Sequence, residues 1–466
     1  MILSVDEVIQ ATEGRLLQGE ENILFEGISI DSRTIQAGDL FIALKGDHFD
    51  GHSFALEVLA GKARGVVVDE EKAGEFRWNG YQRKAVIGVR DTLRALGDLA
   101  RERRRKFQTP VLALTGSNGK TTTKEMISTC LGTTLPLLKT EGNLNNLIGL
   151  PLTLLRLTEK EKVVVLEMGM NIPGEIRRLT RIAEPDVGLI TNVQLAHLEG
   201  MGSLERLTEE KGELFRRMKP DGTILVNRDD PGVVQLAKEF SGDKITFGVN
   251  GPADIMARNV RLIGSKGTSF TLVLGGEETE MSLPLLGRHF ISHALSAIAA
   301  AKLFGVELKK ISEALEHFHP FPMRMEICPL GEGMTLINDA YNANPASMEA
   351  ALETLAEVKG KGRALAVLGD MLELGDFTEE AHRRLGERIG ELSIDQLIFL
   401  GEEASRVVES ALRKGMAPER AKVVKNHSEA ISFLSHTIRE GDWILVKGSR
   451  RMGMEKIAEA LMKGRE

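Results

Sequence analysis

Residues 111–123, with the sequence VLALTGSNGKTTT, constrain the fold more than any other part of this chain. An apolar run leads into a glycine-rich turn, and Lys120 with the threonines around it begins a predicted helix. A strand, a glycine loop and a helix start in that order form the phosphate-binding arrangement of nucleotide triphosphate enzymes, because glycine lets backbone N–H groups approach phosphate oxygens closely. In such a loop the Lys120 ammonium binds the β- and γ-phosphates, and the Thr121 hydroxyl binds Mg²⁺.

The spacing of this loop is unusual. Two residues separate Gly116 from Gly119, whereas the standard phosphate loop has four residues before its Gly-Lys pair. A Gly-Lys-Thr tripeptide alone is a weak signal. The apolar run before it and the helical pattern after it favour nucleotide binding over an ordinary strand-to-helix turn.

Length and charge define the class of protein. The 466 residues exceed one typical core, so two to four domains are expected. With 42% hydrophobic and 27% charged residues, the chain has the composition of a soluble globular protein. Its net charge of -7 offers no basic surplus for neutralising phosphates, so no nucleic-acid partner is expected. The one basic cluster, at residues 101–106, is interpreted as a solvated linker or a helix end.

The expected cellular location rests on the cysteines, the N-terminus and the length of the apolar runs. Cys130 and Cys328 share no metal-ligand spacing and are interpreted as buried thiols in a reducing compartment. The N-terminus has no basic region ahead of an apolar core, so no secretory signal is predicted. No apolar run reaches membrane-spanning length. We therefore expect a cytoplasmic protein without membrane insertion.

Alternating apolar runs and helical patterns predict an α/β protein. The basic cluster before Pro110 marks a first domain boundary, and His-Pro-Phe-Pro at residues 319–322 marks a second. Residues 287–305 are predicted as an alanine-rich helix. Continuous apolar strands separated by helices predict open, mostly parallel sheets with helices on both faces. The predicted strands are residues 23–30, 40–44, 66–68, 85–89, 111–114, 163–166, 187–190, 335–338, 364–368, 396–400, 422–424 and 443–446.

Polar residues follow the predicted strands of both later segments. Ligands of parallel α/β sheets collect at the carboxyl ends of the strands. If the two segments face each other, these polar groups line one cleft. They are Glu167, Thr191, Asn192, His197, Asp339, Tyr341, Asn342, Asp370, Lys447, Ser449 and Arg450.

Glu167 is the leading candidate metal ligand among them. A charge at the end of an apolar strand is costly unless it has a partner, and Mg²⁺ takes oxygens from one or two carboxylates plus phosphates and water. A glutamate that simply reaches water is the alternative. On pattern alone His197 is more often structural than a ligand, Lys211 is a solvated lysine in a Glu-rich helix, and residues 142–146 form a turn.

Further motifs are spread along the chain. They are EGNLNNLIG at 141–149, AHLEGMG at 196–202, KGE at 211–213, NDAYNAN at 338–344, LGDMLELG at 368–375 and LVKGSR at 445–450, preceded by Asp31-Ser32-Arg33 and GDLF at 38–41. Together with the short loop TGSNGKTT at 115–122, they make the chain similar to the Mur ligase family, and within it to the members that add D-alanyl-D-alanine. The resemblance covers essentially the whole chain in the right order.

The resemblance implies three α/β domains. Residues 1–108 would form a small mixed domain that binds the UDP substrate. Residues 109–322 would form a central phosphate-loop domain with a parallel sheet that binds ATP, and residues 323–466 a C-terminal Rossmann-like domain that binds the incoming D-Ala-D-Ala. Because acyl phosphates hydrolyse, a mobile third domain is expected to close over the site and exclude water.

The activity that the resemblance implies is ATP-dependent peptide-bond synthesis. The C-terminal carboxylate of UDP-N-acetylmuramoyl-tripeptide attacks the γ-phosphate of ATP and becomes an acyl phosphate. The amine of D-alanyl-D-alanine then attacks that carbonyl through a tetrahedral intermediate, and phosphate leaves. This ligase reaction is the last cytoplasmic step in making the peptidoglycan precursor, and a monomer using ATP and Mg²⁺ is expected.

The family likeness also assigns catalytic residues. Lys120 and Mg²⁺ would offset the repulsion between carboxylate and phosphates, with the metal on Thr121 and Glu167. His197 and a carbamylated Lys211 would hold a second Mg²⁺. Carbamylation needs a neutral amine, so the neighbours of Lys211 must lower its pKa, which the adjacent residues 209–210, both glutamates, would oppose if they were close.

Binding residues are carried over from the family in the same way. The Asn-x-x-Asn pattern usual in the family for adenine is replaced here by Phe290 and His293. The nucleotide candidates are Thr115, Gly116, Ser117, Asn118, Gly119, Lys120, Thr121, Thr122, Phe290, His293, Arg324, Asp339, Tyr341 and Asn342. The substrate candidates are Ser29, Asp31, Ser32 and Arg33 for the uridine nucleotide, Asn143, Asn145 and Asn146 near the phosphates and the tripeptide, and Lys447, Ser449 and Arg450 for the dipeptide.

Two other functions stay open at this point. A sister ligase would add a single diamino acid or a glutamate, but the Asp-Asn-Pro-Arg motif usual for a diamino acid is absent and Lys-Gly-Ser-Arg at 447–450 favours the dipeptide. A regulatory ATPase would bind ATP without substrate-dependent turnover. The sequence leaves open whether the third tripeptide residue is diaminopimelate or lysine.

Overall fold

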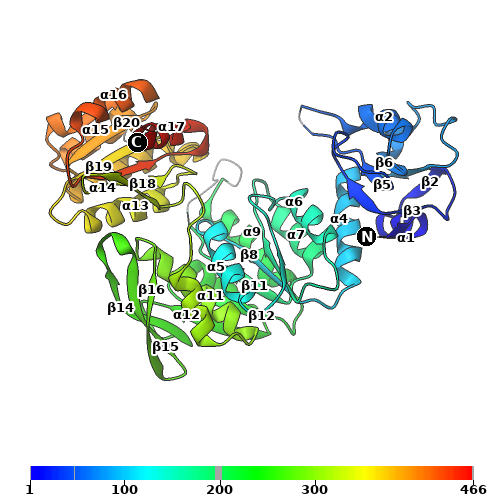
Figure 1. Cartoon of the computed structure of the whole chain (residues 1–466), viewed down its shortest axis with the longest axis horizontal. Helices are drawn as coiled ribbons and strands as arrows, with labels where there is room; N and C mark the ends of the chain where they lie inside the picture. Colours follow the sequence, from blue (N-terminus) through cyan, green and yellow to red (C-terminus); the bar gives the residue numbers. More distant parts are fainter. Residues whose placement is uncertain (1, 47, 195–201, 464–466) are drawn as a thin grey trace.

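The structure, a computed structural model, describes residues 2–46, 48–194 and 202–463. Three α/β domains follow one another along the chain, as expected, and the first and third lie at opposite ends of the central one (Figure 1). The boundaries at 108/109 and 322/323 stay predictions. Within the described ranges, no helix is both long and apolar enough to cross a membrane.

The first domain has a five-stranded sheet of order β2-β7-β6-β5-β4 and a two-stranded sheet of β1 and β3. Its strands are β1 (Leu3–Ser4), β2 (Arg15–Gln18), β3 (Leu24–Phe25), β4 (Gly27–Ser29), β5 (Asp39–Ile42), β6 (Gly65–Asp69) and β7 (Ala85–Val89). Its helices are α1 (Val5–Thr12), α2 (Ala55–Ala60), α3 (Glu70–Ala73) and α4 (Thr92–Arg105). The single strand predicted at 23–30 is wrong, because β3 pairs with β1 and β4 pairs with β5, so the chain changes sheets at Glu26.

The central domain contains one nine-stranded sheet of order β16-β15-β14-β13-β12-β11-β8-β10-β9. Its strands are β8 (Val111–Thr115), β9 (Leu137–Lys139), β10 (Val163–Glu167), β11 (Val187–Ile190), β12 (Thr223–Asn227), β13 (Asp243–Gly248), β14 (Ile255–Leu262), β15 (Thr268–Leu274) and β16 (Glu277–Leu283). Its helices are α5 (Lys120–Gly132), α6 (Gly149–Leu155), α7 (Glu175–Ala183), α9 (Leu204–Arg217), α10 (Pro231–Ala237), α11 (His289–Leu303) and α12 (Leu308–Glu316). Because β8 lies between β10 and β11 in parallel pairing, the ends of these three strands meet at one edge.

Strands β14, β15 and β16 were not among the predicted strands. They form an antiparallel extension of the otherwise parallel sheet, whose parallel pairing continues from β9 to β14. The signal was present in the sequence, since bulky apolar residues occupy every second position at 270–274 and again at 281–283, on either side of Gly275-Gly276, a typical hairpin turn.

The third domain contains a six-stranded sheet of order β17-β18-β22-β19-β20-β21, with β17 antiparallel at the edge. Its strands are β17 (Glu326–Gly331), β18 (Met334–Asp339), β19 (Ala364–Gly369), β20 (Gln396–Leu400), β21 (Ala421–Val424) and β22 (Trp443–Lys447). Its helices are α13 (Pro345–Val358), α14 (Thr378–Glu391), α15 (Ala404–Arg413), α16 (His427–Thr437) and α17 (Glu455–Lys463). The five predicted parallel strands agree with β18 to β22 to within a residue or two.

The phosphate-loop strand β8 is buried on both faces. Leu112 and Leu114 pack in the cluster that includes α5 and α11 side chains, while Val111 and Ala113 pack in the cluster that includes α4 and α7 side chains. Fully burying such aliphatic side chains contributes about 1.5–3 kcal/mol each. The continuous apolar run is therefore explained by helices on both faces, which hold the loop at its end in place.

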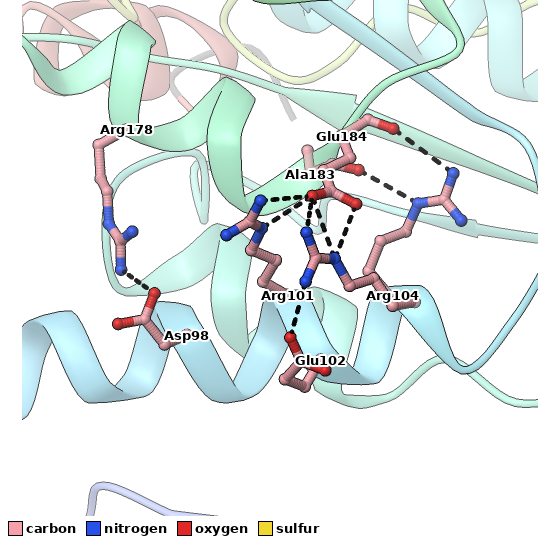
Figure 2. A network of polar contacts seen from close by, with 8 residues as sticks. Asp98, Arg101, Glu102, Arg104, Arg178, Ala183 and Glu184 are labelled. Atoms are coloured by element: carbon pink, nitrogen blue, oxygen red, sulfur yellow. Dashed lines mark hydrogen bonds and ion pairs between the residues drawn. The ribbon is translucent and has the colours of Figure 1, made fainter. Parts of the chain in front are cut away.

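The basic cluster ends helix α4 and fastens it to the central domain (Figure 2). Arg101 and Arg105 each place a guanidinium nitrogen 2.7 Å from Glu184. Arg104 is buried and lies 2.8 Å from Asp186. The helix-end interpretation is confirmed, but the solvated-linker interpretation is wrong, because these arginines find carboxylates at the end of α7 and the start of β11. Of the two cysteines, Cys130 is buried and Cys328 is partly exposed.

Candidate active site

A cleft of about 610 Å³ lies between the central and third domains. The loop after β8, the ends of β10 and β11 and the start of α11 line it from the central side. The loop between β18 and α13 and the end of β22 line it from the third domain. The predicted residues among its lining are Ser117, Asn118, Gly119, Lys120, Thr121, Thr122, Asn143, Asn145, Asn146, Glu167, Asn192, Phe290, His293, Arg324, Asp339, Tyr341, Asn342, Lys447 and Arg450.

The phosphate loop needs glycine at two positions. A Cβ on Gly116 would lie 1.9 Å from Thr191 Oγ1, and one on Gly119 would lie 2.0 Å from His293 Cε1. Gly119 is also the left-handed N-cap of α5, with φ of 75°, and no side chain caps the helix. The N–H groups that begin α5 are therefore available to an anion.

Lys120 is held at the start of this helix. Its ammonium donates to the carbonyl oxygens of Gly116 at 2.9 Å and Ser117 at 3.3 Å. Desolvation, and to a smaller extent the nearby Arg324, place the pKa of Lys120 below its ordinary value, whereas Glu167 opposes this shift. The side chain is positioned over the loop where phosphates would lie.

Glu167 is the buried carboxylate of the site. Its Oε1 accepts from Asn145 Nδ2 at 2.8 Å and from Thr121 Oγ1 at 3.2 Å. Its Oε2 is buried and has no hydrogen-bond partner. An unpaired carboxylate oxygen beside a hydroxyl suits Mg²⁺, which takes oxygen ligands from the protein, phosphates and water. No group of three or more His, Cys, Asp or Glu in the described part of the chain could hold a metal, so phosphates or water would complete the shell.

Lys211 on α9 corrects the sequence interpretation. It is buried, not solvated, and its ammonium donates to Gly116 O at 3.0 Å. Desolvation and then the charge of Lys120 hold the pKa of Lys211 well below its ordinary value, and Glu210 opposes this shift. Glu209 is exposed. His197, predicted as its partner at a second metal, lies outside the described residues.

Arg324 and Arg450 lie on one tyrosine of the third domain. The Arg324 guanidinium carbon is 4.0 Å from the centre of the Tyr341 ring, and that of Arg450 is 5.9 Å away. Arg324 also donates to Thr121 Oγ1 at 3.2 Å, and its Nε is buried without a partner. Tyr341 therefore orders two cations at the mouth of the phosphate loop.

Asp339 and Lys447, predicted for different ligands, form an ion pair with each other. Lys447 also donates to Asn342 O at 3.0 Å, and Asp339 Oδ1 accepts from Met325 N at 3.0 Å. Ser449 lies outside the cleft lining, because its hydroxyl accepts from Leu372 N at 2.8 Å within the domain.

The two adenine candidates begin helix α11. Phe290 and His293 are buried and line the cleft. Burial lowers the pKa of His293 to about 3 and that of His289 to about 4, so both imidazoles are neutral at ordinary pH. A neutral imidazole has one donor and one acceptor nitrogen.

The uridine candidates form a separate group in the first domain. Asp31 accepts from Arg33 Nε at 2.9 Å and Nη2 at 2.7 Å, which lowers the pKa of Asp31 to about 2. The Ser29 hydroxyl accepts from Asp31 N at 3.2 Å. These residues and Ser32 are not part of the cleft between the central and third domains.

Sequence reasoning named Asn192 but missed two other polar residues of the cleft, Gln194 and Asn344. Asn192 Oδ1 accepts from Asn118 N at 2.9 Å, and Gln194 Oε1 accepts from Asn118 Nδ2 at 2.8 Å. Asn344 reaches Asn118 from the third domain. The signals available were the position of Gln194 shortly after an apolar strand and the Asn-Pro start of a helix at Asn344.

Three α/β domains with a phosphate loop facing an interdomain cleft define a nucleotide-dependent multidomain enzyme. Three family models match in order: "Mur ligase family, catalytic domain" at residues 24–104, "Mur ligase middle domain" at 114–301 and "Mur ligase, glutamate ligase domain" at 323–450. The chain belongs to the Mur ligase family.

Named relatives match over nearly the whole length. A UDP-N-acetylmuramoyl-tripeptide--D-alanyl-D-alanine ligase of Bacillus subtilis is 36% identical, covering 99% of this chain and 98% of the relative. The Escherichia coli ligase of the same name is 36% identical, covering 96% of each. Solved structures include MurF from Acinetobacter baumannii, with a TM-score of 0.89, 33% identity and 99% coverage of both chains. MurF ligase from Thermotoga maritima in complex with ADP has a TM-score of 0.82 and 27% identity, covering 94% of this chain and 97% of that one.

Proposed function

We propose that this chain joins D-alanyl-D-alanine to the C-terminal carboxylate of UDP-N-acetylmuramoyl-tripeptide at the expense of ATP. The observation that carries the proposal is the end-to-end similarity to ligases of that name, combined with a phosphate loop that faces groups of the third domain across one cleft. The reaction would complete the cytoplasmic peptidoglycan precursor.

The first step is transfer of the γ-phosphate to the tripeptide carboxylate. Lys120 and the free N–H groups that begin α5 would hold the phosphates, and Arg324 would approach them from the third domain. Mg²⁺ at Glu167 and Thr121 would neutralise phosphate charge when bound. The residues at 197 and 211, a histidine and a carbamylated lysine, would hold a second Mg²⁺.

The second step is attack by the dipeptide amine on the acyl phosphate. Lys447 and Arg450 lie on the third-domain side of the cleft, where an incoming dipeptide carboxylate would be bound. Closure of the third domain over the loop would exclude water from the acyl phosphate, which otherwise hydrolyses. Asn143, Asn145 and Asn146 line the central side, where the tripeptide would lie.

The remaining assignments follow from composition and position. Phe290 and His293 would contact adenine, Asp339 the ribose, and Ser29, Asp31, Ser32 and Arg33 the uridine nucleotide. The net charge of -7 supports a protein that binds no nucleic acid. We also place the chain in the cytoplasm, as a monomer that does not insert into membranes.

The test is ADP release with UDP-N-acetylmuramoyl-tripeptide, ATP and Mg²⁺, comparing D-alanyl-D-alanine with single amino acids as acceptor. Turnover that requires the dipeptide supports the proposal. Turnover with a single amino acid indicates a sister ligase, and ATP binding without acceptor-dependent turnover indicates a regulatory ATPase. Diaminopimelate and lysine tripeptides, tested side by side, decide the third residue.

A further inference from the structure

A pair of asparagines joins the phosphate loop to the third domain. Asn344 Nδ2 donates to Asn118 Oδ1 at 2.6 Å, and Asn118 Nδ2 donates to Asn344 Oδ1 at 3.2 Å. The two residues are 226 positions apart in the chain. We call this contact the amide pair. It brings the residue before Gly119 against the start of helix α13.

Asn344 also caps helix α13, and this second role fixes the orientation of its side chain. Its Oδ1 also accepts from Ser347 N at 3.0 Å and so caps helix α13. The oxygen therefore accepts from both Ser347 N and Asn118 Nδ2, while the NH₂ group donates to Asn118 Oδ1. Ser, Thr and Asp cap helices as well as Asn does, but none of them carries an amide that could donate across the domains. Among these capping residues, only asparagine can both cap α13 and donate a hydrogen bond to Asn118.

Asn118 is fixed just as firmly on the central side. Its backbone N–H donates to Asn192 Oδ1 at 2.9 Å, and its carbonyl accepts from Thr191 Oγ1 at 2.7 Å. Its Nδ2 donates also to Gln194 Oε1 at 2.8 Å. Further hydrogen bonds hold both side chains of the amide pair. Their contact therefore fixes how the third domain is placed against the phosphate loop.

We propose that the amide pair positions the third domain on the phosphate loop, so that Arg450 and Lys447, which would bind the dipeptide carboxylate, face that loop across the cleft. This inference rests on the proposed ligase function. Asn344 acts here as a positioning residue, because its side chain contacts the phosphate loop through Asn118. Its loss should weaken use of the dipeptide, which the third domain meets, much more than binding of the nucleotide.

The variants that test this are Asn344→Ser and Asn344→Thr. Both keep a capping hydroxyl for α13, and both are too short to donate to Asn118. The matched control is Asn426→Ser, because Asn426 caps α16 of the same domain through Glu429 N at 3.0 Å and is exposed. Thermal unfolding of all three reports whether the cap change alone has damaged the domain.

Steady-state kinetics give the first readout. We expect kcat/KM for D-alanyl-D-alanine to fall about tenfold in both Asn344 variants, the size expected for losing one or two neutral hydrogen bonds. Affinity for a fluorescent ATP analogue should stay within about twofold of the unsubstituted protein, the usual range of a surface substitution. Values for both variants equal to that of Asn426→Ser would overturn the proposal, as would an equal loss of nucleotide affinity.

A distance measurement separates this inference from the ligase assignment. Spin labels at Gln235→Cys and Ser405→Cys, both exposed positions, report the spacing of the two domains in a Cys328→Ser background. Asn344→Ser should broaden or shift the distance distribution, and Asn426→Ser should not. If the unsubstituted chain makes no ligated product, the ligase proposal fails while this distance still decides the amide pair. An unchanged distribution would overturn it.

Discussion

At the residue scale, the site contains buried charged groups that lack an oppositely charged partner or a full set of hydrogen bonds. Glu167 is buried with one unpaired oxygen, and Lys211 is buried against a carbonyl with Lys120 near it. Such groups reduce stability unless a ligand completes them, which is typical of functional sites. Their surroundings, more than their residue types, define what they can do.

Replacing Glu167 by Gln should abolish metal-dependent nucleotide binding while leaving the fold intact. The amide keeps the shape but offers one oxygen fewer and no charge, so turnover should fall by roughly 10²-fold or more. Titration with Mn²⁺ in the presence of ATP, followed by its electron paramagnetic resonance signal, measures the metal separately from turnover. Glu353→Gln, on the exposed face of α13, is the control. Unchanged Mn²⁺ affinity would contradict the metal assignment.

The lowered pKa of Lys211 predicts how stability depends on pH. Between that lowered pKa and the ordinary value of 10.5, the unfolded chain binds the proton that the folded chain has lost. Stability therefore rises with pH across this window, by up to about 1.4 kcal/mol per pH unit. Urea unfolding from pH 7 to 9 in CO₂-free buffer measures this dependence. The free energy of unfolding of the unsubstituted protein should rise with pH relative to that of Lys211→Met. A constant difference would mean that the ammonium is not desolvated.

At the element scale, most of the continuous apolar strands were predicted, but β9, β12 and β13 of the parallel sheet were missed as well as the hairpin strands. Strands β11 and β20 agree with the predicted residues, because both are buried on two faces. Strands β14 and β16 were overlooked because exposed residues interrupt their apolar pattern, and β15 because three hydroxyl residues interrupt its buried run. The burial of Lys211 could not be predicted, since α9 looks amphipathic with that lysine among glutamates.

The turn from β8 into α5 gives an element-scale prediction. Gly119→Ala should abolish nucleotide binding, because the new methyl would meet the His293 ring and push the loop away. Gly305→Ala is the matched control, since its φ of 77° is close to the 75° of Gly119 and nothing lies within 4 Å of its Cβ. The control should lose only about 1 kcal/mol of stability, the cost of a left-handed alanine. Equal nucleotide affinity in both variants would contradict this account of the loop.

At the scale of the whole molecule, both domain contacts combine polar pairs with an apolar cluster that spans the two domains. Helix α4 joins the first domain to the central one through the arginines that end it (Figure 2) and a continuous apolar cluster. The third domain meets the phosphate loop through polar pairs such as Asn118–Asn344 and Arg324–Thr121. The third domain also shares an apolar cluster with the central domain, which contains Leu295 of α11 and Leu352 of α13. Domain order was predictable from motif order, but the identity of these contacts was not.

The α4 contact predicts a large effect from one arginine. Arg104→Met removes the partner of Asp186 and a donor to Ala183 O, and should destabilise the protein by about 2–3 kcal/mol, as breaking a buried ion pair does. Arg105→Met, whose side chain is 45% exposed, should cost about 1 kcal/mol or less. Urea unfolding of both variants provides the comparison. Equal, small losses would mean that α4 is not fastened by Arg104.

The central claim is that ATP activates the tripeptide carboxylate and is not merely hydrolysed beside it. The most direct measurement uses tripeptide nucleotide labelled with ¹⁸O in its C-terminal carboxylate, incubated with ATP, Mg²⁺ and D-alanyl-D-alanine. The account predicts one ¹⁸O atom in each phosphate released, together with the elongated peptide. Unlabelled phosphate would contradict it, because water and not the carboxylate would then have received the γ-phosphate.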